Sequence, residues 1–201
     1  MIIGIDLGGM SAKGALLVGD QLKGKSRVET SASDTAEQTA LAIASLVLQT
    51  AEKANKQLDD IQAIGIGAPG VVDSEHGIIV SWTNFGWKNV RLAALVEKFT
   101  GKKTFLLNDA NAAALGEAEY GAGKRFSDSV LLTLGTGIGS GIILGGKLFE
   151  GFRSAGAEIG HVVIHRDGEL CSCGRKGCFE RYASASALIR FTRESMRAEP
   201  Y

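Results

Sequence analysis

The three cysteines of the chain, Cys171, Cys173 and Cys178, are grouped in one short segment. Two histidines, His161 and His165, precede them. Three thiolates and one imidazole form a closed tetrahedral ligand set for zinc. An odd number of cysteines in a reducing compartment argues against a disulfide framework, and no apolar run surrounds them as it would surround free buried thiols. The segment therefore predicts a zinc site, structural because all four ligands come from the protein.

Two glycine-rich strings each separate two apolar runs, at residues 6–14 (DLGGMSAKG) and 135–141 (GTGIGSG). Neither string ends in the Lys-Ser/Thr of a P-loop, and β-branched residues follow the second where a dinucleotide-binding fingerprint needs a helix. We expect β-hairpins whose glycines allow positive φ and let an anion approach the backbone N–H groups. Plain turns without a ligand are the alternative. The repetition, with Asp6 and Thr136 at the strand ends, favours phosphate binding.

Asp109 lies where an apolar run, 104–107, meets an alanine-rich helix expected over 108–121. One interpretation is a helix N-cap. The other is a general base that takes a proton from a substrate hydroxyl while that oxygen attacks the γ-phosphorus of ATP. Residue chemistry alone favours neither interpretation over the other. The position at the carboxyl end of a strand, where open α/β sheets bind ligands, favours the base.

The elements that must position these residues are short strands and a few helices. Apolar spacing predicts a helix over 35–57, capped by Ser33 or Asp34, and a second over 91–99 that ends at Gly101. Other expected elements are strands over 1–5, 15–18, 61–66, 130–134, 142–144 and 161–164 and a last helix over 187–196 capped by Ser184 or Ser186. This mixture predicts an α/β protein.

The sequence of strand, glycine turn and strand occurs twice, which suggests two α/β lobes with a boundary near residues 121–124. We therefore expect an N-terminal lobe over 1–121 and a second, partial lobe over 122–201. A length of 201 residues is compatible with two small domains.

Charge and hydropathy restrict the classes of partner. Lys+Arg and Asp+Glu are both 22, which gives a net charge of +0 and no electrostatic footprint for nucleic acid or an anionic membrane. No segment approaches the roughly 20 apolar residues of a membrane helix, and Gly4 and Asp6 interrupt any signal-peptide core. We expect a cytoplasmic protein that binds neither nucleic acid nor membrane.

Six strings occur in the order found in ROK-family (repressor, open reading frame, kinase) sugar kinases of the actin/hexokinase/Hsp70 ATPase superfamily. They are DLGGMSAKG (6–14), GAPG (67–70), NDANAAALGE (108–117), LGTGIGSGI (134–142), EIGH (158–161) and CSCGRKGCFERYAS (171–184). The last two together are the most specific. The chain therefore resembles a glucokinase-like member of this family. The resemblance implies an α/β actin-like ATPase (ribonuclease H-like) fold with two lobes, the second incomplete because relatives continue beyond Tyr201.

The resemblance also implies a role for each matching position. Asp109 corresponds to the catalytic base, and His161 rather than His165 to the zinc ligand beside the three cysteines. The residues implied to bind the sugar are Gly70, Asn84, Asn108, Asp109, Glu158, His161 and Glu180. Those implied to contact ATP and its Mg²⁺ are Asp6, Gly8, Gly9, Ser11, Lys13, Gly135, Thr136, Gly137 and Gly139. Met10 stands where the family usually has Thr, so Ser11 is the candidate to supply that hydroxyl.

The activity implied is ATP-dependent phosphorylation of a hexose or amino-sugar hydroxyl by a homodimer or higher oligomer. An inactive sugar-binding fragment of such a kinase is the main alternative, because the chain stops at Tyr201. A sugar-responsive transcriptional regulator is less favoured, because those relatives carry a helix-turn-helix ahead of the first glycine string and nothing precedes it here except residues 1–5. Trp82 and Trp87, which flank Asn84, either wall the sugar pocket or pack in the core.

Overall fold

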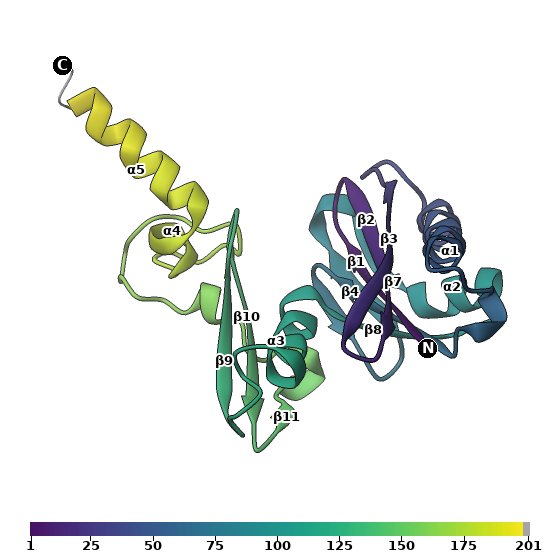
Figure 1. The fold of residues 1–201 in the computed structure, drawn as a ribbon. Coiled ribbons are helices and arrows are strands. Elements are labelled where there is room, and N and C mark those ends of the chain that lie inside the picture. The colour runs from purple at the N-terminus through teal and green to yellow at the C-terminus, as the bar shows by residue number, and fades with distance from the viewer. Residues whose placement is uncertain (199–201) are drawn as a thin grey trace. The chain divides into compact units, whose positions relative to one another are not determined.

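The computed structural model describes residues 1–198 (Figure 1). The chain forms two compact units, Met1–Ala112 and Ala113–Tyr201. The division falls inside helix α3 (Asp109–Tyr120), whereas the sequence suggested a boundary at its end. Over residues 1–198, none of the helices combines the length and the apolar character that crossing a lipid bilayer requires.

The first unit is built on a five-stranded sheet in the order β3-β2-β1-β4-β8. Its strands are β1 (Ile2–Leu7), β2 (Ser11–Val18), β3 (Gln21–Glu29), β4 (Ala63–Ala68) and β8 (Lys103–Asn108). The first three strands are antiparallel neighbours, and β1, β4 and β8 are parallel. This order is the expected ribonuclease H-like arrangement, and it places the carboxyl ends of the three parallel strands at one edge.

Two helices, α1 (Ala36–Lys53) and α2 (Leu92–Thr100), contact each other and the sheet, α1 at β2 and β3 and α2 at β8. Fully buried side chains of α1 such as Ile43 and Leu46 meet those of the strands in the core. The N-cap of α1 is Thr35, not Ser33 or Asp34. Thr35 Oγ1 accepts from the Gln38 N–H at 3.2 Å, and Gln38 Oε1 accepts from the Thr35 N–H at 2.8 Å, which forms a capping box.

A small sheet of β5 (Val71–Asp73), β6 (Ile78–Trp82) and β7 (Trp87–Val90) completes the first unit, together with the 3₁₀ turns η1 (Leu58–Asp60) and η2 (Thr83–Phe85). Trp82, Phe85 and Trp87 are buried against one another, with the rings of Trp82 and Phe85 stacked at 3.9 Å. Both tryptophans therefore belong to the core. This agrees with the interpretation that they pack in the core.

The second unit contains a three-stranded sheet, β9 (Ser129–Leu134), β10 (Ile138–Leu144) and β11 (Lys147–Leu148), then the 3₁₀ turns η3 (Phe152–Ser154) and η4 (Ile159–His161) and helices α4 (Glu180–Ala183) and α5 (Ala185–Ala198). The expected strand over 161–164 is absent, and only a single bridge joins Val163 to Cys178. Helix α5 begins two residues before the expected 187, and the Ser184 hydroxyl accepts from the Ala187 N–H.

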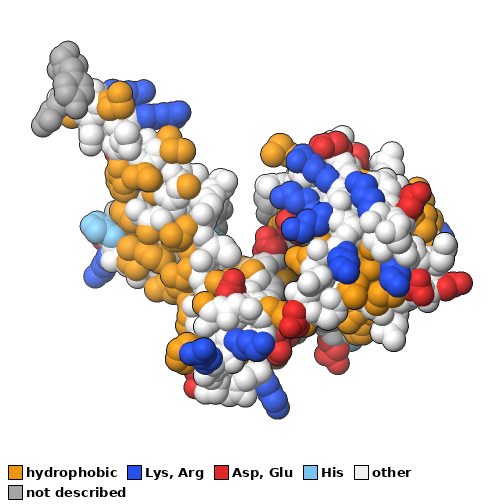
Figure 2. All heavy atoms as spheres, in the orientation of Figure 1, with side chains coloured by type: hydrophobic (Ala, Val, Ile, Leu, Met, Phe, Trp, Pro, Cys, Tyr) orange, Lys and Arg blue, Asp and Glu red, His pale blue; other side chains and the backbone are white. Residues whose placement is uncertain are grey.

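Hydrophobic side chains gather on the surface of the second unit (Figure 2). They include residues of the edge strand β9, such as Val130 and Leu134, and of α5, such as Leu188 and Ile189. Proteins commonly cover such edges and faces with further polypeptide.

Candidate active site and metal centre

The carboxyl edge of the first sheet collects the polar candidates of that unit. Asp6 is exposed near the C-terminal end of β1 and pairs with Gly67 of β4. Ala68, the last residue of β4, pairs with Asn108 of β8. Asp109 follows directly as the first residue of α3. Parallel strand ends of this kind are where open α/β sheets bind ligands.

Asn108 holds the start of α3. Its Oδ1 accepts from the N–H groups of Ala110 and Asn111 at 3.0 and 3.1 Å, and its Nδ2 donates to the carbonyl of Gly70 at 3.1 Å. The capping function that the sequence left open for Asp109 is thus carried by Asn108. Asp109 Oδ1 accepts from the Ala110 N–H at 2.8 Å.

The pKa of Asp109 is raised above its ordinary value. Although the residue is open to solvent, the surrounding protein desolvates its carboxyl group, and this is the largest cause; the negative charge of Asp6 raises the pKa further. Hydrogen bonds from Ala110 and Asn108 act in the opposite direction. A carboxylate that is accessible yet more basic than usual suits proton abstraction.

Two hydrogen bonds within the chain hold the first glycine turn. The Gly8 N–H donates to the Ser11 carbonyl at 2.9 Å, and Thr30 Oγ1 donates to the Gly8 carbonyl at 3.0 Å. Ser11 opens β2, and the exposed Lys13 on that strand lies 3.9 Å from Asp6. Thr30 was not identified from the sequence, because no local pattern predicts a hydrogen bond to a residue 22 positions away.

The second glycine turn is shorter than expected. It spans only residues 135–137, where the Gly135 N–H donates to the Gly137 carbonyl at 3.0 Å and Thr136 is exposed. Gly139 lies inside β10, paired with Thr133. Glycine allows positive φ, but Gly8, Gly9, Gly135, Gly137 and Gly139 all have φ outside the positive range. The other property expected of these glycines, close approach of an anion to the backbone, does not depend on positive φ.

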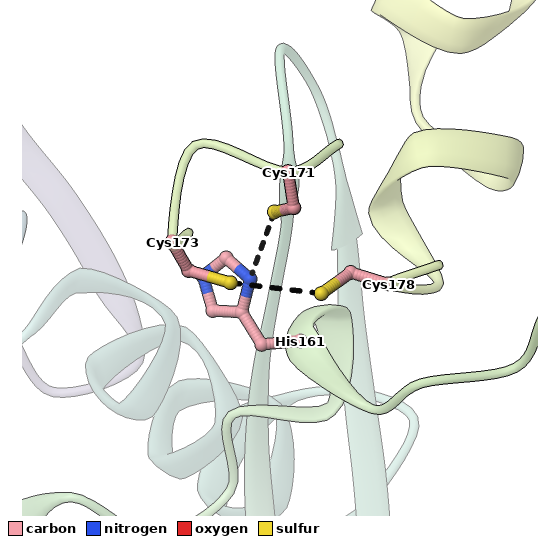
Figure 3. Close-up of side chains that lie close together, drawn as sticks. All are labelled: His161, Cys171, Cys173 and Cys178. Carbon is pink, nitrogen blue, oxygen red and sulfur yellow. Dashed lines mark hydrogen bonds between the residues drawn. The ribbon is translucent and has the colours of Figure 1, made fainter. Parts of the chain in front are cut away.

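Four side chains of the second unit point toward one another (Figure 3): His161, Cys171, Cys173 and Cys178. Their ligand atoms all lie within 4.8 Å of one another. His161 Nδ1 is 3.6 Å from Cys171 Sγ, and Cys173 Sγ is 3.6 Å from Cys178 Sγ. Ligand atoms in a tetrahedral zinc site are about 3.5–3.8 Å apart, given metal–ligand distances of about 2.0–2.3 Å. The donor set and these two spacings fit zinc.

His165 is not part of this group. Its ring faces that of Tyr182 with 5.9 Å between the centroids. Within the cluster, desolvation by burial raises the pKa of Cys171 to about 12, while the Arg175 N–H lowers that of Cys173 to about 6. A bound cation would favour the thiolate of each cysteine.

The acidic candidates of the second unit differ in environment. Glu158 is exposed before η4. Glu180 opens α4, is largely buried, and places Oε1 3.0 Å from Cys171 Sγ and 3.7 Å from His161 Nδ1. Glu180 and His161 are therefore neighbours.

The remaining candidates, Gly70 and Asn84, lie in the first unit. Gly70 has φ +88°, which explains the glycine there, and its carbonyl receives the Asn108 hydrogen bond. Asn84 is exposed in η2.

Ser140 was missed by the sequence reasoning. Its hydroxyl donates to the Ala157 carbonyl and accepts from the Ile159 N–H at 3.0 Å, which attaches β10 to the EIGH segment. Its position inside the string GTGIGSG was the available signal.

Known proteins resemble the chain over nearly all of its residues. It is 41% identical over 198 residues to a glucokinase of Thermotoga maritima, a match that covers 98% of this chain and 61% of the relative. A ROK glucokinase of Streptomyces griseus, solved with glucose and AMPPNP, superposes with a TM-score of 0.83 at 38% identity and covers 99% of this chain and 62% of that one. A xylose repressor of Caldicellulosiruptor bescii is 38% identical over 144 residues, which are 72% of this chain and 36% of the repressor.

The chain thus spans about three fifths of the length of these glucokinases. The similarity confirms the expected actin-like ATPase fold. The sequence pattern of the ROK family matches residues 2–200, and the chain belongs to the ROK family.

Proposed function

We propose that the chain is the sugar-binding and proton-accepting part of an ATP-dependent sugar kinase that acts on a hexose or amino-sugar hydroxyl. The observation that carries the proposal is Asp109: an accessible carboxylate with a raised pKa, at the carboxyl edge of a sheet, in a chain related to glucokinases. The glucokinase of Streptomyces griseus was solved with glucose and an ATP analogue, which supports glucose as the first substrate to test.

In the proposed reaction, the ionised Asp109 accepts the proton of the substrate hydroxyl. The hydroxyl oxygen forms a bond to the γ-phosphorus of ATP, the bond between that phosphorus and the β–γ bridging oxygen breaks, and ADP leaves. Asn108 fixes the start of α3 and so orients the carboxylate. Magnesium would neutralise phosphate charge, with Asp6 as the candidate to face it.

The sugar would be held by a set of donors and acceptors suited to alternating hydroxyls. The proposed set is Gly70, Asn84, Asn108, Asp109, Glu158, His161 and Glu180. The proposed phosphate contacts are the N–H groups of the turns at 8–9 and 135–137, with Ser11, Lys13, Thr136 and Gly139 nearby in sequence.

We also propose that His161, Cys171, Cys173 and Cys178 hold a structural zinc ion. All four ligands come from the protein, so no position is open for a reacting group. The ion would fix the imidazole of His161 and the loop that leads into Glu180. Thiolate ligands of this kind fit the reducing cytoplasm, and the exposed apolar surface of the second unit fits assembly into a homodimer or higher oligomer.

ADP release measured with a panel of hexoses and amino sugars tests the kinase proposal, with equilibrium sugar binding measured in parallel. Turnover with one sugar supports a kinase. Sugar binding without turnover supports the inactive fragment, and binding of neither sugar nor ATP contradicts both.

Similarity to the xylose repressor supports a second candidate, a sugar-responsive regulator. The two differ in chemistry: a regulator binds sugar and releases no ADP, and its oligomeric state or DNA affinity changes when sugar binds. The glucokinase match covers 98% of this chain and the repressor match 72%, which favours the kinase.

A further inference from the structure

The carboxylate of Glu180 lies between the cysteine segment and the second glycine turn. Its Oε1 is 3.0 Å from Cys171 Sγ, and its Oε2 lies so close to Gly137 that a Cβ at that position would be 2.6 Å from it. The side chain is only 14% exposed, so it is held on several sides.

The backbone of Gly137 does not itself require glycine. Its φ is outside the positive range that side chains avoid. The neighbouring Gly135 shows the contrast, because a Cβ there would meet no atom within 4 Å. Space, rather than conformation, therefore restricts residue 137, and the space is taken by Glu180.

Hydrogen bonds hold the turn and the strand that follows it. The Ala185 N–H, at the start of α5, donates to the Gly135 carbonyl at 2.9 Å. Ser140 joins the following strand to Ala157 and Ile159. We therefore expect the end of the Glu180 side chain, which can change rotamer, to move rather than the hydrogen-bonded turn.

We propose that Gly137 is a positioning residue: because it has no side chain, the Glu180 carboxylate can occupy the space beside it. The proposal deepens the proposed function and rests on it, because it takes Glu180 as a ligand of the sugar. The turn that would contact ATP therefore packs directly against the carboxylate that would contact the sugar. Gly137 would then have a role besides phosphate binding.

The test is sugar affinity without nucleotide, measured by calorimetry for Gly137→Ala, Glu180→Ala and the double variant. Loss of a hydrogen bond to a charged group weakens binding about 10- to 100-fold, so we expect that range for Glu180→Ala. We expect Gly137→Ala to weaken binding at least about tenfold and to add nothing in the double variant, because the displaced side chain is already gone. The control is Gly116→Ala, the same change at an exposed helical site with open space.

Sugar affinity of Gly137→Ala equal to that of the unaltered chain overturns the inference, as does full additivity in the double variant. If Gly137→Ala does not fold, Glu180→Ala must restore folding in the double variant, and failure to restore it also overturns the inference. If the unaltered chain binds no sugar, the proposed function fails separately. Crystal structures of the unaltered chain and Gly137→Ala then decide: a displaced Glu180 carboxylate supports the inference and an unmoved one contradicts it.

Discussion

Asn108 donates a hydrogen bond from Nδ2 to the carbonyl of Gly70 at 3.1 Å, while its Oδ1 caps α3. One side chain thus joins the end of β8, the turn after β4 and the helix that begins with Asp109. The geometry that presents Asp109 depends on this amide.

Replacing Asn108 with Ala should destabilise the chain by about 1–2 kcal/mol, because the cap is lost. Asn108→Ser keeps an accepting oxygen for the cap and adds no charge, so its cost should be smaller. Urea unfolding of both variants measures the difference. Equal stability of Asn108→Ala and the unaltered chain would contradict the capping role.

The pH dependence of turnover should reflect the raised pKa of Asp109. The base works only when ionised, so kcat/KM should fall as pH decreases through a pKa above 3.8, its ordinary value. Asp6→Asn removes a negative charge that raises this pKa, so the Asp109 titration should move to lower pH. Carboxyl carbon NMR measures the titration directly and does not depend on activity; no shift in Asp6→Asn would show that the two groups do not interact.

Removal of metal should lower the melting temperature of the chain and disorder the segment around Cys178. His161→Ala should lose metal affinity by at least about 100-fold, since even outer-shell substitutions cost 10- to 100-fold. His165→Ala is the matched control and should retain one equivalent of zinc in elemental analysis. Retention of zinc by His161→Ala, or its loss from His165→Ala, would show that the ligand assignment is wrong.

The N-terminus of α1 gives a test of local stability. Thr35→Ala removes the acceptor of the capping box and should cost about 1 kcal/mol. Ser33→Ala, two residues earlier, should change the free energy of unfolding by less than about 0.5 kcal/mol. Thermal or urea unfolding measures both, and a larger effect at Ser33 would place the cap there instead.

Sequence patterns identified the elements that are short apolar runs or whose ends carry strong signals. The runs that became β1, β4 and β8 are of this kind, and Gly101 ends α2 in the left-handed conformation as expected. The group formed by His161 and the three cysteines was equally visible, because its members are close in sequence.

Other features depend on tertiary contacts or on signals that were overlooked. Strand β3 (Gln21–Glu29) is mostly polar and exposed, so its pairing with β2 leaves no apolar alternation to detect. The glycines at 139 and 141 suggested a turn, although they lie within β10 beside β9. The cap Thr35 was predictable in principle, because Thr-Ala-Glu-Gln has the spacing of a capping box.

The central claim is that Asp109 accepts the proton during sugar phosphorylation, and ADP release by Asp109→Asn with glucose tests it most directly. The amide keeps the shape and the Ala110 contact, so folding and glucose affinity should be preserved while turnover falls about 10²- to 10⁴-fold. Turnover by Asp109→Asn equal to that of the unaltered chain would contradict the account.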